Sequence, residues 1–238
     1  MARHAARARG GGAVWLLVVA ALLLITWVWW AGTQQTEPAP PAAEPPAPAP
    51  QQAAPYIADS RPLEMYIPAI GLDAAFESND CRAHDGTIDP ATLDLACAYT
   101  APDRPYSLPG SQAEDIVVTA GHTGSGVEAV FDKLYDGSAD HHTVREGDVL
   151  YLRTEASGEA WLKYTATDFH DPVKASLSSD ASIWGYGPTP GRLLTISCIQ
   201  PPFYQQSVRN AVVGWQFEGV AGPIEGAVGP APVPPPKA

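Results

Sequence analysis

The stretch DVLYLRTEASGEAWLKYTATD, residues 148–168, decides the fold class. It holds two runs rich in aromatic and β-branched residues, Asp148–Thr154 and Ala160–Asp168, on either side of a polar break that contains Gly158. Such residues suit the pleated, half-buried surface of a β-strand, and polar residues with glycine mark the turns between strands. The stretch therefore predicts two strands of an all-β domain.

The same pattern recurs on both sides of this stretch. The further expected strands are Glu64–Ile70, Leu72–Glu77, Thr87–Ile88 with its flanks, Asp115–Ala120, Leu193–Cys198 and Ala211–Phe217. Val127–Tyr135 is expected to be helical, because its apolar residues recur at helical spacing on one face. A closed or nearly closed antiparallel barrel of eight strands with one or two short helices leaves no exposed sheet edge, and it is the expected fold.

An apolar run at residues 13–31 precedes this domain. At about 1.5 Å per residue it matches the roughly 30 Å hydrocarbon core of a bilayer, so a transmembrane helix is expected. A cleaved signal peptide is the alternative, but its apolar region is normally about 7 to 15 residues long and ends in small residues. Here the run closes on Trp29 and Trp30, and tryptophan prefers the membrane interface.

The flanking charges predict the orientation. Arg3, Arg7 and Arg9 precede the apolar run, and no Lys or Arg follows it until Arg61. By the positive-inside rule the N-terminus is cytoplasmic and the rest of this single-pass protein of the cell membrane is extracellular. The expected organisation is a cytoplasmic segment 1–12, an anchor 13–31, a Pro/Ala-rich extended linker 32–60, one globular domain 61–221 and a Pro-rich disordered tail 222–238.

Charge argues against one class of partner. The chain has 14 Lys and Arg against 26 Asp and Glu, for a formal net charge of -12. So acidic a protein repels phosphate backbones and gains nothing from counterion release. Nucleic acid is therefore not an expected partner.

The chain has three cysteines, so at least one thiol is unpaired. An extracellular domain permits disulfides, and Cys81 and Cys97 flank a short turn-rich segment. A bridge between these two is favoured over two reduced cysteines, although spacing alone does not fix the pairing. Cys198 is then the free thiol.

Three side chains fall where expected strands begin or stop. Cys198 ends the run LLTISC and is soon followed by Pro201 and Pro202, which cannot continue a central strand. His122 stands in a glycine-rich loop after IVVTAG, and Arg209 opens the last strand. Taken singly they would be a buried inert thiol, a solvated imidazole and a surface guanidinium. Together they supply what a nucleophilic cysteine needs, namely a base or cation and a donor for the oxyanion.

The order of motifs resembles the sortase family of cysteine transpeptidases. The motifs are IPAIGLDA (67–74), VVTAGHTG (117–124), VFDKLYD (130–136), EGDVLYL (146–152), LLTISC (193–198) and VRNAVV (208–213). The resemblance covers nearly all of residues 62–220 and implies the eight-stranded sortase β-barrel. The single N-terminal anchor and the Ala, Gly, Pro and Arg bias resemble actinobacterial members of class E or F. Where the family has Thr-Leu, this chain has Leu194-Thr195, which moves the hydroxyl to the other strand face.

By that resemblance Cys198 would attack the Thr–Gly bond of an LPxTG-like sorting signal on a secreted protein, and an amine of a peptidoglycan precursor or a pilin would resolve the thioacyl intermediate. His122 would transfer the protons, and Arg209 would hold the oxyanion or the substrate backbone. No cofactor or metal is implied. The expected substrate contacts are Ser197, Thr195, Trp184 and Tyr204.

Other classes fit less well. Papain-like peptidases place cysteine before histidine, whereas no histidine follows Cys198, and the Ser-His-Gly-Cys run expected of L,D-transpeptidases is absent from the sequence. A zinc site from His122, His141 and His142 lacks convergent spacing, since adjacent residues of a strand point to opposite sides. The alternative outside enzymes is an extracellular β-domain for binding or wall structure, in which Cys198 is buried and inert.

Overall fold

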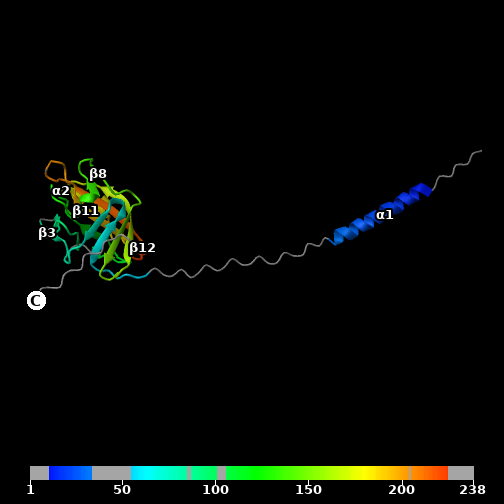
Figure 1. Cartoon of the computed structure of the whole chain (residues 1–238), viewed down its shortest axis with the longest axis horizontal. Helices are drawn as coiled ribbons and strands as arrows, with labels where there is room; N and C mark the ends of the chain where they lie inside the picture. Colours follow the sequence, from blue (N-terminus) through cyan, green and yellow to red (C-terminus); the bar gives the residue numbers. More distant parts are fainter. Residues whose placement is uncertain (1–10, 34–54, 85–86, 101–105, 204, 225–238) are drawn as a thin grey trace, which may run out of the picture. The chain divides into compact units, whose positions relative to one another are not determined.

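The computed structural model describes residues 11–33, 55–84, 87–100, 106–203 and 205–224 (Figure 1). The chain divides into two compact units, Met1–Gln51 and Gln52–Ala238. In the first, helix α1 (Gly11–Gly32) contains a window at Trp15–Gly32 with a mean hydropathy of 2.0, long and apolar enough to cross a membrane. The expected segments 1–12, 32–60 and 222–238 lie largely outside the described residues.

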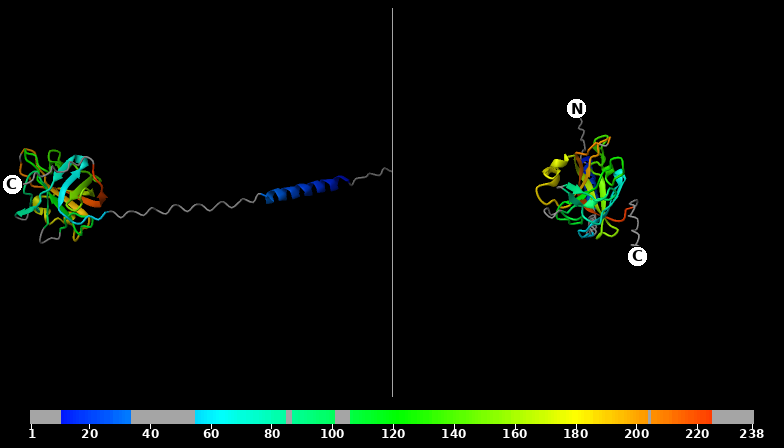
Figure 2. Two further views of the ribbon diagram at one scale, coloured as in Figure 1. Left: turned by 60° about the horizontal axis from the view of Figure 1, so that its bottom comes forward. Right: turned by 90° about the vertical axis from the view of Figure 1, so that its left-hand side faces the viewer.

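The second unit is built on one curled sheet (Figure 2). The sheet has eight strands, in the order β2-β1-β9-β10-β12-β11-β6-β5. The strands are β1 (Pro62–Ile67), β2 (Leu72–Ala75), β5 (Cys97–Ala98), β6 (Val117–Ala120), β9 (Val149–Thr154), β10 (Trp161–His170), β11 (Arg192–Cys198) and β12 (Asn210–Ala221). Neighbouring strands run antiparallel except β6 and β11, which are parallel. The prediction of an all-β fold with eight sheet strands is confirmed.

The two edge strands of this sheet, β2 and β5, meet through an isolated parallel bridge between Phe76 and Ala96. Ala96 N donates to Ala75 O at 2.9 Å, and Glu77 N donates to Ala96 O at 2.7 Å. These bonds close the sheet into a barrel, so neither edge offers a long row of unpaired backbone groups.

Two hairpins lie outside the eight-stranded sheet: β3 (Arg82–His84) with β4 (Thr87–Asp89), and β7 (Tyr135–Asp136) with β8 (His141–His142). The expected strand at Thr87–Ile88 therefore exists as part of β4 but does not belong to the barrel. The barrel position belongs to β5, which is only two residues long and so shows no alternating pattern in the sequence.

The expected helix at Val127–Tyr135 is wrong. Only a single 3-10 turn forms there, η2 (Asp132–Leu134), and Val127 is exposed. The reason is local: the Asp132 carboxylate accepts hydrogen bonds from Gly124 N at 2.6 Å and Ala129 N at 2.8 Å, which folds the chain into a compact loop. The other short helices are η1 (Pro68–Ile70), α2 (Lys174–Leu177) and α3 (Ala181–Trp184).

Strand β11 is buried on both faces. Leu193 belongs to the cluster inside the barrel, whereas Leu194 and Ile196 belong to a second cluster that also contains Ile183 of α3. A strand covered on both sides reads as a continuous apolar run instead of an alternating one, which explains the sequence LLTISC.

The strand directions give the barrel two distinct ends. Strands β6 and β11 finish at one end, and β12 begins there because it runs antiparallel to β11. The opposite end holds the start of β1, where Pro62 pairs with Thr154, and the finish of β12, where Ala221 pairs with Trp161. The described parts of the barrel unit therefore enter and leave at the end away from the finish of β11.

Candidate active site

The parallel pairing of β6 and β11 brings Cys198 and His122 together. Ile196 pairs with Ala120, and continuing that register by two residues places Cys198 opposite His122. Two bonds extend the pairing past the end of β6: Gly121 N donates to Ile196 O at 3.1 Å, and Thr123 Oγ1 donates to Cys198 O at 2.9 Å. The thiol and the imidazole thus come from neighbouring strand ends although 75 residues separate Thr123 from Cys198.

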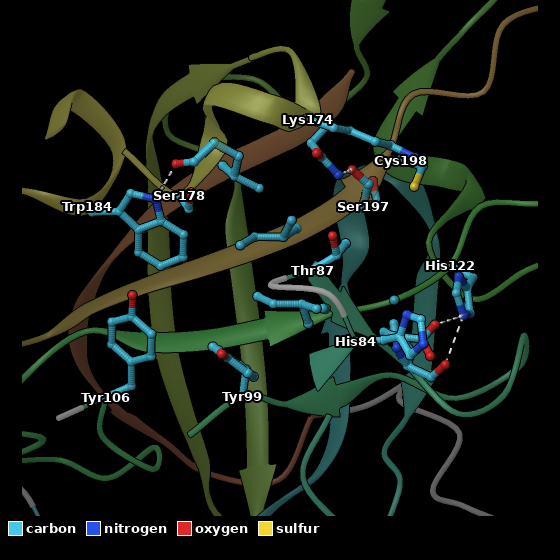
Figure 3. Close-up of a pocket in the computed structure, with 18 residues that line it drawn as sticks. His84, Thr87, Tyr99, Tyr106, His122, Lys174, Ser178, Trp184, Ser197 and Cys198 are labelled. Atoms are coloured by element: carbon cyan, nitrogen blue, oxygen red, sulfur yellow. Dashed lines mark hydrogen bonds and ion pairs between the residues drawn. The ribbon is translucent and has the colours of Figure 1, made fainter. Parts of the chain in front are cut away.

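Both side chains line a cleft of about 720 Å³. Cys198 is a free, partly exposed cysteine. Figure 3 shows Cys198 and His122 at one end of this cleft, and Trp184 with Tyr106 at the other. The thiol is therefore open to a ligand and is not sealed in the core.

The imidazole of His122 is held by the segment that follows β4. His122 Nε2 lies 3.0 Å from Pro90 O and 4.0 Å from Asp89 Oδ1. A carbonyl oxygen can only accept, so Nε2 carries a proton in this arrangement. In the neutral ring the lone pair is then on Nδ1, which is the atom able to take a proton.

The loop that carries His122 packs tightly against Phe131 and Val130. Phe131, which is fully buried, donates its N–H to His122 O at 3.0 Å. A Cβ at Gly121 would lie 2.7 Å from the Phe131 ring and 2.7 Å from Val130 Cγ1. Glycine is therefore required beside the histidine because the aromatic ring touches the backbone there.

The structure does not bring the guanidinium of Arg209 to this cleft. Arg209 Nη1 donates to Asp171 Oδ2 at 2.5 Å, and Nη2 donates to Asp140 Oδ1. The hydrogen bond from Arg209 is the main reason that the pKa of Asp140 lies below its usual value. Arg209 is not among the residues that line the cleft, although its backbone is close, because Ile199 N donates to Arg209 O at 3.0 Å.

The four expected substrate contacts differ in placement. Trp184 and Ser197 line the cleft, and the buried Ser197 hydroxyl has no hydrogen-bond partner within the described part of the chain. Thr195 does not reach the cleft: it is fully buried, and its Oγ1 accepts from Trp215 Nε1 at 3.1 Å, because its strand face is the interior of the barrel. Tyr204 lies outside the described residues.

In the structure Cys81 and Cys97 form a disulfide. This bond ties the start of hairpin β3–β4 to strand β5 of the barrel. The tied hairpin forms one wall of the cleft, through His84, Thr87, Ile88 and Asp89. Sequence reasoning missed this wall. An Asp-Gly pair at residues 85–86, a frequent hairpin turn, was the available signal, although those two residues lie outside the described ranges.

Aromatic rings form the far end of the cleft. Tyr106 stacks on Trp184 with ring centroids 5.4 Å apart, and Tyr99 lies 5.9 Å from Tyr106. Trp184 Nε1 donates to Leu177 O at 2.6 Å, which fixes the indole between α2 and α3. Two nearby aromatic residues do not line the cleft: Tyr186 is 99% exposed and Phe203 is 87% exposed.

The zinc alternative gains no support from the geometry. Within the described ranges, no group of three or more His, Cys, Asp and Glu side chains is placed to hold a metal ion. His142 lies instead between the rings of Tyr135 and Phe169, where burial lowers its pKa.

Taken together, the site is a cleft with a free thiol and an imidazole at the ends of two parallel strands of a β-barrel. No family model matches the chain, and no curated protein matches it. Solved structures that the chain resembles include several sortases. At identities of 15 to 19% and TM-scores of 0.45 to 0.48, this likeness assigns neither an activity nor a substrate.

Three of these structures illustrate the range. Sortase C-1 from Actinomyces oris is 19% identical, with 65% of this chain and 72% of that chain covered and a TM-score of 0.46. Sortase A from Listeria monocytogenes is 15% identical, with 71% and 94% covered and a TM-score of 0.45. Sortase C-3 from Streptococcus pneumoniae is 15% identical, with 83% and 81% covered and a TM-score of 0.48.

Proposed function

We propose that this protein is a sortase-type cysteine transpeptidase that cleaves an LPxTG-like sorting signal between Thr and Gly and joins the acyl product to an amine. One observation carries the proposal: the free thiol of Cys198 and the imidazole of His122 open into the same cleft from adjacent parallel strands. The motifs of the sequence, in the order His, Cys, Arg, support the same activity.

The proposed reaction uses these two groups in sequence. The Cys198 thiol gives its proton to His122, and the sulfur adds to the Thr carbonyl carbon, whose π electrons move to the oxygen. When the C–N bond breaks, His122 gives the proton to the departing glycine amine, leaving a thioacyl enzyme. An incoming amine then loses a proton to His122, attacks the thioester carbonyl and expels the thiolate.

Arg209 enters the proposal with the role that the resemblance implies, holding the oxyanion or the substrate backbone. That role requires its guanidinium to leave Asp140 and Asp171, since both carboxylates now hold it. An arginine stays charged throughout, so such a movement needs no change of protonation.

The cellular location, the donor proteins and the acceptor amine are proposed from the apolar helix and from the resemblance to sortases. Helix α1 anchors the protein in the cell membrane with the N-terminus cytoplasmic and the barrel outside. The donor partners are secreted proteins with a C-terminal sorting signal. The acceptor is an amine of a peptidoglycan precursor or of a pilin.

The test uses the full chain in detergent, incubated with a small library of LPxTG-like peptides and several amines. Intact mass should show a peptide acyl group on Cys198, and product mass should show the amine joined to Thr. Cys198→Ala should abolish both signals. If Cys198→Ala still cleaved the peptides, or if no peptide acylated the wild-type protein, the proposal would be wrong.

A further inference from the structure

At the start of β12, the side chains of Arg209 and Asn210 project from opposite faces of the sheet. Cys198 and Asn210 are directly opposed partners of the β11–β12 ladder, so their side chains project from the same sheet face. Arg209, one residue earlier, projects from the other face, together with Ala211 and with Ile199 across the ladder. The side chain of β12 that shares the cleft with the thiol is therefore Asn210, which is a lining residue, and not Arg209.

The hydrogen bonds show how close this pair is. Asn210 N donates to Pro172 O at 2.9 Å, on the side of β12 away from β11, and Ile199 N donates to Arg209 O at 3.0 Å. Cys198 and Asn210 are thus a non-hydrogen-bonded pair, the kind in which side chains approach most closely, with Cβ atoms about 4.5 to 5.5 Å apart.

The carboxamide of Asn210 is oriented and half-buried. Its Nδ2 donates to Ser197 O at 3.0 Å, a backbone atom of the residue before the thiol. A carboxamide has two N–H groups, and this bond uses one of them. The bond therefore fixes the amide plane next to Cys198 and leaves a second N–H for another acceptor.

From this geometry we infer that Asn210 is a catalytic residue that donates its second Nδ2–H to the oxyanion formed when Cys198 adds to a carbonyl. The inference rests on the proposed function for its physiological substrate. As the sulfur–carbon bond forms, the carbonyl oxygen gains the negative charge within reach of an amide that is already fixed, so little reorganisation is needed. An amide donor carries no charge, so it binds the neutral carbonyl weakly and the oxyanion strongly.

The experiment compares two reactions of the same thiol in the full chain in detergent. Acetylation of Cys198 by p-nitrophenyl acetate passes through an oxyanion, whereas alkylation by iodoacetamide does not. Asn210→Ala and the nearly isosteric Asn210→Leu should slow acetylation about 10- to 100-fold and leave alkylation nearly unchanged. Asn79→Ala, which removes an exposed amide outside the cleft, is the matched control and should change neither rate. Cys198→Ala gives the background rate.

Two results would overturn the inference: an unchanged acetylation rate in both Asn210 variants, or a parallel loss of acetylation and alkylation, which would mean that the amide only supports the thiol. Melting curves identify a variant that fails to fold. Asn210→Leu nearly preserves the side-chain volume, so it keeps the test informative if Asn210→Ala does not fold.

Sorting peptides tested alongside distinguish the role of Asn210 from the proposed sortase function. If peptides never acylate Cys198 but acetylation still depends on Asn210, the proposed function fails and the oxyanion donor stands.

Discussion

The disulfide between Cys81 and Cys97 gives the most quantitative prediction. It closes a loop with a sequence separation of 16, and in the chain-entropy model such a loop contributes about 3 kcal/mol to the free energy of unfolding. For a domain of this size, 1 kcal/mol moves the melting temperature by about 2 to 4 °C, so losing the bond should lower it by about 6 to 12 °C. Because Cys81 and Cys97 are buried, reductant should reach the bond mainly in the unfolded state.

The assay is thermal unfolding with and without reductant, in a Cys198→Ala background that prevents thiol exchange. The double variant Cys81→Ala/Cys97→Ala should unfold at the midpoint of the reduced protein and should not respond to reductant. Amide hydrogen exchange in hairpin β3–β4 should also become faster, since the bond ties that hairpin to β5. A midpoint that is the same with and without reductant would show that the loop-entropy reasoning is wrong for this chain.

Three further predictions follow from the site and the barrel. Gly121→Ala would place a Cβ 2.7 Å from the Phe131 ring, so it should displace His122 and lower peptide cleavage about tenfold or more, with alkylation of Cys198 as the measurement of an intact thiol. Burial raises the pKa of Asp168, but hydrogen bonds from Arg192, Thr167 and His170 outweigh it and hold that pKa well below the usual value. The resulting stabilisation is present above the unfolded pKa of about 3.9 and is lost as the pH falls below it, so Asp168→Asn should be less stable at pH 7 and show a flatter loss of stability in acid. Asp140→Asn combined with Asp171→Asn should free the guanidinium of Arg209 and raise the rate of peptide cleavage, whereas a lower rate in a folded variant would argue that the two carboxylates position Arg209 for the reaction.

The strands that carry the thiol and the imidazole could be predicted because each ends in residues that stop a strand. Pro201 and Pro202 follow β11, and a glycine-rich loop follows β6. What the sequence cannot show is that β6 and β11 are parallel neighbours, because pairing partners depend on the whole topology of the barrel.

The direction of Arg209 was beyond sequence reasoning for a related reason. A change of one position along a strand moves a side chain to the other face of the sheet, so Arg209 and Asn210 can be told apart only when the register with Cys198 is known. Thr195 fails as a substrate contact in the same way. Of the hairpin β3–β4, only the strand at Thr87–Ile88 was expected from the sequence. Strand β3 was missed because it is three residues long and exposed throughout, so it shows no apolar pattern.

The end of the barrel at which β1 starts and β12 finishes has a practical use. A resin, a sensor chip or a fusion partner coupled before residue 55 or after residue 224 would be joined to the barrel unit at the end away from Cys198. Each immobilised molecule would then carry its free thiol at the end away from the support, so these coupling points suit oriented immobilisation.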